Sequence, residues 1–238
     1  RSSSPVRIVR DAIPLISVKS KKLEDGYYWV RLTRFSERTT EELKDALKDA
    51  AKESKATGGL KGIVLDLRNN PGGLLDQAVS VSDTFLDKGV IVSIKGRRDS
   101  TDRVYEAKKQ ADDVRVPMVV LVNAGSASAS EIVAGALQDM DRAVLVGRRT
   151  FGKGLVQSTR PLGYNAYLKV TTAKYYLPSG RCIQAIDYAS RAEDGTLSHI
   201  PDSLITEFRT AAGRRVYDGG GVMPDVRVPA EYVSRFAY

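Results

Sequence analysis

Histidine and cysteine are almost missing from this sequence, and their scarcity excludes several kinds of chemistry. The 238 residues contain one histidine, His199, and one cysteine, Cys182. An intramolecular disulfide is excluded, and a zinc site has too few of its usual ligands, so we expect no bound metal. A Ser-His-Asp triad would depend on His199, which follows Ser198 in a polar segment typical of an exposed loop.

Long apolar runs and nucleotide-binding loops are also missing. The longest apolar run, Val116 to Val122, is far shorter than the roughly 20 residues that cross a bilayer, so no membrane span is expected. The sequence contains neither G-x-x-x-x-G-K-[ST] nor a G-x-G-x-x-G after a strand, and we expect no cofactor. No signal peptide follows Arg1, so the chain is expected to be a fragment or a processed form.

The charge of the chain is positive but dispersed. The net charge is +8, from 37 basic and 29 acidic residues, and the basic residues stand in short clusters such as Arg97-Arg98. No cluster is interleaved with aromatic residues that could stack on bases, which favours a solvated surface over a nucleic-acid partner. The hydrophobic fraction of 42% is enough for a sizeable core.

Apolar periodicity and turn residues predict an α/β chain. Short strands are expected in 13–35 around a turn at 24–26, and a helix is expected at 39–53. Further strands are expected at 62–67, 90–96, 116–122, 143–147 and 166–178, and further helices at 74–86 and 130–140. Residues 97–115 are interpreted as charged and irregular, and residues 186–215 as polar and loop-rich, with a short helix near 203–208. Because strands alternate with helices, we expect parallel pairing in a layered fold.

Three serines stand in the stretch NAGSASASE, residues 123–131, between an expected strand and an expected helix. Backbone N–H groups at a helix N-terminus favour a developing oxyanion, so one of these serines could act as a nucleophile. The plainer alternative is a helix cap, worth about 1 kcal/mol. A second amide donor could come from the Gly72-Gly73 turn, because that turn follows the expected parallel strand 62–67.

A nucleophilic serine in a chain without a suitable histidine needs another base, and lysine is the usual substitute. No lysine here has a serine three residues before it, and G-x-S-x-G is absent as well. Lys153 is the best candidate, because Gly152 and Gly154 flank it and let the backbone approach a neighbouring segment. Gln157 could hold the lysine amine by a hydrogen bond. A solvated lysine in a turn is the alternative.

Five segments resemble one known family, in the same order along the chain: DLRNNPGG, NAGSASASEIVAGALQD, GRRTFGKGLVQ, YYLPSGRCIQ and YDGGGVMPDV. They resemble the C-terminal processing proteases, also called tail-specific proteases, over about residues 7–228. The resemblance implies a serine endopeptidase with a Ser/Lys dyad. It implies an α/β fold with a mixed layered core of the crotonase-like type and small β-rich terminal portions. It also implies protein or peptide substrates that bind as extended C-terminal segments.

The resemblance also assigns roles by position. It implies that Ser128 is the nucleophile, Lys153 the general base and Gln157 the residue that orients the lysine. The oxyanion donors are expected to be the amide of Ala129 and one amide of Gly72 or Gly73. Asp139 falls on an acidic position of the family helix and is expected to be supportive, while Ser126 and Ser130 become turn and helix-cap residues.

The resemblance also implies how the whole protein is organised and where it acts. Residues 1–12 resemble the segment that follows a PDZ domain in relatives, and that domain is expected to be missing here. The expected protease core is 13–228, divided into β-rich 13–35, α/β 36–183 and loop-rich 184–228, and 229–238 form a tail. Family members mostly act in the periplasm, envelope or thylakoid lumen, which implies a periplasmic or envelope location. A homo-oligomer is left open.

Two other functions stay open at this point. One is a non-catalytic relative of the fold that binds peptides or apolar ligands. The other is an acyl-CoA enzyme of the crotonase-like type, which shares oxyanion stabilisation by two amides and has no need of Ser128.

Overall fold

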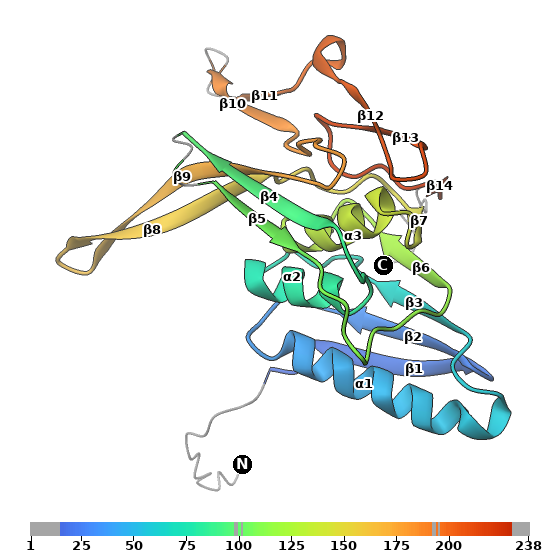
Figure 1. The fold of residues 1–238 in the computed structure, drawn as a ribbon. Coiled ribbons are helices and arrows are strands. Elements are labelled where there is room, and N and C mark those ends of the chain that lie inside the picture. The colour runs from blue at the N-terminus through green and yellow to red at the C-terminus, as the bar shows by residue number, and fades with distance from the viewer. Residues whose placement is uncertain (1–14, 98–99, 101, 192–193, 195, 230–238) are drawn as a thin grey trace, which may run out of the picture.

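The largest sheet carries the strands from which the candidate residues extend. The structure is a computed structural model and describes residues 15–97, 100, 102–191, 194 and 196–229. In this part of the chain the sheet has the strand order β1-β2-β3-β6-β7-β14 (Figure 1). Its strands are β1 Val18–Glu24, β2 Tyr27–Leu32, β3 Gly62–Asp66, β6 Met118–Val122, β7 Val144–Gly147 and β14 Val226–Arg227. β1 and β2 are antiparallel, and every pair from β2 to β14 is parallel, so the carboxyl ends of β3, β6 and β7 share one edge.

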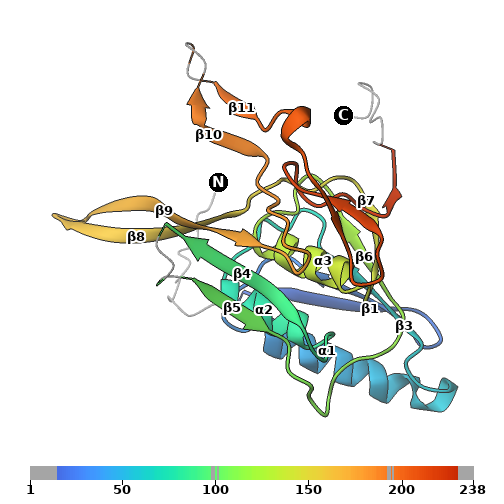
Figure 2. The ribbon, with the colours of Figure 1, turned by 45° about the horizontal axis from the view of Figure 1, so that its top comes forward.

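A second sheet is antiparallel and has the order β5-β4-β9-β8. Its strands are β4 Val90–Gly96, β5 Arg103–Glu106, β8 Leu155–Gly163 and β9 Ala166–Tyr176. β8 and β9 form a long hairpin that extends away from the body of the molecule (Figures 1 and 2). Two smaller hairpins follow, β10 Ile186–Arg191 with β11 Leu197–His199 and β12 Glu207–Arg209 with β13 Arg215–Tyr217.

Helices lie against the parallel sheet, and those nearest the second sheet also lie beneath β4 (Figure 1). They are α1 Thr39–Glu53, α2 Leu75–Asp83 and α3 Ala129–Asp139, with short 3₁₀ turns at η1 Ser54–Thr57 and η3 Asp202–Leu204. α1 is amphipathic and turns Leu43, Leu47 and Ala50 inward, whereas every residue of α3 is buried. Small residues in α3 allow its neighbours to pack closely around it. At Gly135, for example, the Leu177 side chain lies so near that an added Cβ would be 2.3 Å from it.

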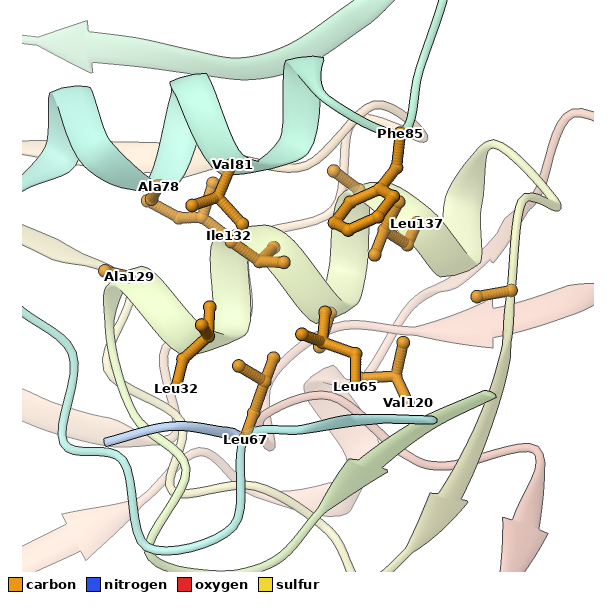
Figure 3. Packing of buried hydrophobic residues seen from close by; sticks show 14 of the residues in the cluster. Leu32, Leu65, Leu67, Ala78, Val81, Phe85, Val120, Ala129, Ile132 and Leu137 are labelled. Atoms are coloured by element: carbon orange, nitrogen blue, oxygen red, sulfur yellow. The ribbon is translucent and has the colours of Figure 1, made fainter. Parts of the chain in front are cut away.

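The hydrophobic core surrounds α3. Figure 3 shows Leu65, Leu67 and Val120 of the parallel sheet and its loops on one side of this helix, with Val81 of α2 on the other. The removal of this much apolar surface from water is the main stabilising contribution to the fold. It also fixes α3 in place, and with it the serine stretch at its N-terminus.

The α/β class and the parallel pairing expected from the sequence are confirmed, and the expected helix at 39–53 has the observed bounds. Two expectations are wrong. Residues 97–115 include β5, and the segment expected to be helical near 203–208 is a 3₁₀ turn at 202–204 followed by β12. The segment expected to be loop-rich, 186–215, also contains short strands that form two hairpins. The strand β8 was not expected either. These strands are short or exposed on both faces, so they lack the alternation that identifies a half-buried strand.

The expected division of the chain stays a prediction. Residues 1–12 and most of the 229–238 tail lie outside the described residues. The β-rich segment 13–35, as far as it is described, is part of the main sheet rather than a separate portion.

Candidate active site

Ser128 begins α3 with a strained backbone. Its φ is 58° and its ψ is −114°, a conformation that residues with side chains avoid and that costs about 1–3 kcal/mol. Two hydrogen bonds hold the turn: the Ser128 N–H donates to Glu131 at 2.8 Å, and the Ala127 N–H donates to the Asn70 carbonyl at 3.0 Å. Such strain is common where a side chain must be presented to a ligand.

The three residues expected to act together do line one cavity. Ser128, Lys153 and Gln157 all border a space of about 310 Å³. Ser128 comes from the end of the β6–α3 loop, Lys153 from the β7–β8 loop, and Gln157 from β8. The apolar part of the lining comes from residues that include Leu75, Ile132, Leu155 and Val156. Ser128 and Lys153 are partly buried, so a ligand in this space would reach both.

Two free amides lie beside the serine. Ala129 and Gly73 line the same cavity, and among the described residues neither N–H has a hydrogen-bond acceptor. The Gly72 N–H, in contrast, donates to the Asn70 side chain at 2.9 Å. The two glycines expected as alternative donors are therefore distinguished, and Gly73 is the one with an available amide.

Gly72 has a steric task instead. Its φ is +100°, and a Cβ there would lie 2.8 Å from the Ser128 Cβ and 2.7 Å from the Ala127 carbonyl oxygen. Only a glycine lets the 72–73 turn approach the serine this closely. This approach brings the Gly73 amide into the cavity that Ser128 lines.

The flanking serines tie two loops together. The Ser126 hydroxyl donates to the Leu67 carbonyl at 2.8 Å, and the Ser130 hydroxyl donates to the Asn70 carbonyl at 2.9 Å. Both serines are fully buried. Ser130 was expected to cap the helix, but its partner lies in the β3–α2 loop, so it joins that loop to α3.

Glu131 connects the nucleophile candidate to the base candidate, and sequence reasoning did not single it out. One carboxylate oxygen accepts hydrogen bonds from the N–H groups of Ser128 and Lys153, both at 2.8 Å. The other accepts from the Thr150 hydroxyl and from the Gly152 N–H at 2.7 Å. Burial raises the pKa of this carboxyl, and the four donors act against that effect. One side chain thus fixes the backbone at both Ser128 and Lys153.

Tyr175 closes the cavity on the side of the second sheet. This residue of β9 lines the cavity, and its hydroxyl donates to the Lys153 carbonyl. Burial and the charge of Glu131 raise the pKa of the Tyr175 hydroxyl, whereas its hydrogen bond with the Ser128 side chain lowers that pKa. Sequence reasoning missed this residue as well, because a tyrosine in a strand carries no signal of its partners.

Other residues named from the sequence lie outside this cavity. His199 is exposed on β11 and does not line the cavity. Cys182 lies outside the cavity lining, and burial raises the pKa of its thiol. Asp139 forms a fully buried ion pair with Arg181 at 2.8 Å and accepts from Ser179, which makes it structural at the far end of α3.

Within the described residues, no group of three or more His, Cys, Asp or Glu side chains could hold a metal ion. No helix in the described part of the chain combines the length and apolar character that a membrane crossing requires.

Comparison with known proteins identifies the family. The model of peptidase family S41 matches residues 26–190, a segment that contains Ser128, Lys153 and the β3–α2 loop. The chain belongs to peptidase family S41. The sequence resemblance to the C-terminal processing proteases is thereby confirmed at the level of the family.

Individual relatives of this S41 chain carry a consistent name. A carboxy-terminal-processing protease of Bartonella bacilliformis is 51% identical over 181 residues, which cover 76% of this chain and 41% of the relative. The carboxy-terminal processing protease CtpA of Bacillus subtilis is 34% identical over 97% of this chain and 47% of its own length. A solved photosystem II D1 C-terminal processing protease has a TM-score of 0.64 and 31% identity, covering 91% of this chain and 49% of that one. The chain therefore spans about half the length of the relatives it matches.

Proposed function

We propose that this S41 chain is the catalytic part of a serine endopeptidase that cleaves protein substrates near their C-termini. The observation that carries the proposal is the cavity in which Ser128 and Lys153 meet the available amides of Ala129 and Gly73. Nucleophile, base and oxyanion donors are the groups that acyl transfer requires. The names of the relatives support the choice of C-terminal processing as the reaction.

The proposed reaction passes through an acyl-enzyme. Lys153, in its neutral form, accepts the Ser128 hydroxyl proton as the oxygen attacks the scissile carbonyl. The protonated lysine then donates that proton to the leaving amine, and Ser128 remains as an ester of the substrate. Water loses a proton to Lys153 and attacks the ester, and the protonated lysine then returns a proton to the Ser128 oxygen as the ester bond breaks and the new C-terminus is released. Gln157, at the cavity wall, orients the lysine amine without adding a charge.

Oxyanion stabilisation in this proposal comes from fixed backbone groups. The Ala129 N–H stands at the N-terminus of α3, where the helix dipole favours negative charge. The Gly73 N–H approaches from the β3–α2 loop. Removal of a single donor of this kind from an enzyme typically lowers kcat about 100- to 1000-fold, so two such donors account for a substantial part of catalysis.

The substrate is proposed to bind as an extended C-terminal segment along a sheet edge. β8 is the edge strand of its sheet, and its first residues line the cavity. An extended peptide can pair with such an edge through its backbone. The core is proposed to be of the crotonase-like type, the location periplasmic or in the cell envelope, and a homo-oligomer is left open.

The experiment that tests the proposal is mass spectrometry of peptides with varied C-termini after incubation with the full-length protein. Wild type should release C-terminal fragments, and Ser128→Ala, Lys153→Ala and the double variant should all be inactive to a similar degree, because residues that act as a unit are not additive. Ser198→Ala and Lys88→Ala, two exposed residues away from the cavity, are the controls and should remain active. Cleavage by Lys153→Ala at the wild-type rate would refute the dyad.

Two alternatives predict other results. A non-catalytic binder would hold the peptides without cleaving them, and an acylating serine reagent would not label Ser128. An acyl-CoA enzyme would act on thioesters and would be indifferent to Ser128→Ala.

A further inference from the structure

A long segment of this chain contains no acidic residue. Between Asp141 and Asp187 the sequence has neither aspartate nor glutamate, although acids make up 29 of the 238 residues. This segment supplies the Lys153 loop and the whole β8–β9 hairpin, on which Arg160, Lys169 and Lys174 are the charged residues. The β8–β9 hairpin, here called the arm, lies beside the catalytic cavity and carries only positive charges. Such a surface favours acidic ligands.

A hollow on this arm lies next to the catalytic cavity. It has a volume of about 490 Å³ and is lined from all four strands of the second sheet, by Arg103 and Tyr105 of β5, Ile94 of β4, Thr172 of β9 and Ser158 and Arg160 of β8, among others. Val156 lines both this hollow and the catalytic cavity. The two spaces are thus neighbours along β8.

Alternation of side chains places both arginines on the same face of the sheet. Arg103 pairs with Ile94 across β5 and β4, and Ile94 belongs to the face that turns toward the core. Ser158 and Arg160 follow Val156 at intervals of two residues, so they share its face of β8. The hollow is therefore the part of this face that extends beyond the core.

A bulge adds a hydroxyl group to the floor of the hollow. Val156 pairs with Ala173 and Gln157 pairs with Thr171, so Thr172 is the extra residue on β9. A bulge re-aims the side chain that it carries. The Thr172 and Ser158 hydroxyls form a hydrogen bond of 3.4 Å, so the hydroxyl that accepts in this pair keeps its own proton for an anion.

Within the described part of the chain, the two guanidinium groups of the hollow have no partner. Among the described residues, neither the Arg103 nor the Arg160 side chain has an ion pair or a hydrogen bond, whereas Arg181 and Arg214 have both. Asp102, which precedes Arg103 in the sequence, accepts a hydrogen bond from the Gly96 N–H instead. The hollow thus combines two free cations with two hydroxyl groups, a donor set that fits a carboxylate.

We propose that this hollow is a subsite that binds a carboxylate of the peptide substrate and so selects acidic substrates. The proposal rests on the proposed function. A peptide paired with β8 would pass from the catalytic cavity at Gln157 toward Arg160, three residues or roughly 10 Å along the strand. A carboxylate three or four substrate residues from the scissile bond would then reach the hollow. It could be an acidic side chain or the C-terminal carboxylate.

The test is a positional series of fluorogenic peptides with the full-length protein. A single Glu is moved through the positions on both sides of the scissile bond, and a matched series carries Gln. At one or two adjacent positions Glu should raise kcat/KM about fivefold over Gln, the range of a partly solvated ion pair, and added salt should reduce this preference. A truncated peptide whose C-terminal carboxylate falls at that position is compared with its amide, which distinguishes a side chain from a terminus as the source.

The variants decide whether the hollow causes the preference. Arg160→Ala and Arg103→Ala should each abolish most of it, because kcat/KM falls more for the Glu peptides than for the Gln peptides, and Arg160→Lys should retain part of it. Arg227→Ala, which removes an exposed cation from the other sheet, should change nothing. Equal rates for Glu and Gln at every position, or an equal loss for both series in the arginine variants, would overturn the proposal.

A binding measurement separates this proposal from the proposed function. Fluorescence anisotropy of labelled Glu and Gln peptides with Ser128→Ala should show the same preference, which the arginine variants again remove. Absence of cleavage by wild type would refute the proposed peptidase alone, whereas absence of a preference in anisotropy would refute the subsite alone.

Discussion

Glu131→Gln offers a sharp test of how the site is held together. In the structure both carboxylate oxygens are engaged, each by two donors. An amide has one acceptor oxygen, so its NH₂ group must face two former donors. The less costly orientation points the NH₂ group at Thr150, whose hydroxyl can turn and accept, and leaves the Gly152 N–H without a partner. A buried unsatisfied donor costs about 1–3 kcal/mol, which is the expected loss in the free energy of unfolding.

The effect on catalysis should exceed the effect on stability. Movement of the Gly152 backbone shifts Lys153, the next residue, and a displacement of about 1 Å at a reacting group can lower the rate about 100-fold. We expect kcat of Glu131→Gln to fall by about this factor with a smaller change in KM. The assay pairs urea denaturation with peptide kinetics, at a temperature where the variant is folded.

Glu42→Gln is the matched control. Glu42 of α1 also accepts several hydrogen bonds, from the Ser17 N–H, the Ser17 hydroxyl and the Val18 N–H, but all of them reach one oxygen. Glutamine can keep all three bonds with its carbonyl oxygen, so the expected loss is about 1 kcal/mol or less, with kcat unchanged. If Glu131→Gln keeps wild-type kcat and resembles this control, the carboxylate does not position the proposed dyad.

Three further predictions concern the surroundings of the site. Burial raises the pKa of the Asp66 carboxyl, but hydrogen bonds from Arg68 outweigh the effect of burial and hold this pKa below its ordinary 3.8. That stabilisation is present above pH 3.8 and is lost as the pH falls through the lowered value, so the difference in unfolding free energy between wild type and Asp66→Asn should shrink in urea titrations below pH 3.8. Gly72→Ala should lose about 1–3 kcal/mol and most of its kcat, whereas Gly163→Ala, also at positive φ but with open space around it, should keep its kcat. Arg181→Ala leaves the Asp139 carboxylate buried without its partner and should lose about 3–5 kcal/mol in urea denaturation.

The parts of the fold that the sequence predicts are those with a buried face. The helix at 39–53 has an apolar stripe at Leu43 and Leu47, and the strand 118–122 is an apolar run, so the sequence predicts both elements. β8 has Arg160, Pro161 and Gly163 and is exposed along most of its length, so neither propensity nor alternation marks it. Its pairing with β9 provides the hydrogen bonds that make it a strand, and pairing is a long-range property.

The residues of the candidate site also differ in how far the sequence alone points to them. Lys153 could be proposed as the base because the chain offers so few other bases and because its two neighbours are glycines, and the structure places it in the cavity that Ser128 lines. Glu131 could not be distinguished, since Ser128 and Glu131 fit the S-x-x-E pattern of a helix start, and that pattern explains the acid without any catalytic task. The structure contains the hydrogen bond that this pattern predicts, because one oxygen of Glu131 accepts from the Ser128 N–H. The remaining bonds, to residues 150–153, depend on how the β7–β8 loop returns to α3.

The three serines of the 123–131 stretch show why residue type alone does not assign a role. Ser126 and Ser130 are bound to carbonyl oxygens 59 and 60 residues away in sequence, in a loop that also supplies the Gly73 amide. Because backbone carbonyls are the acceptors, no side chain in the β3–α2 loop reveals these contacts. They hold the loop against the helix on both sides of Ser128, whose strained φ then persists without a bond of its own to that loop. If Ser128 is the nucleophile, as proposed, the two structural serines are a condition for its action, since they keep the proposed oxyanion donors, on separate elements, within reach of a single substrate oxygen.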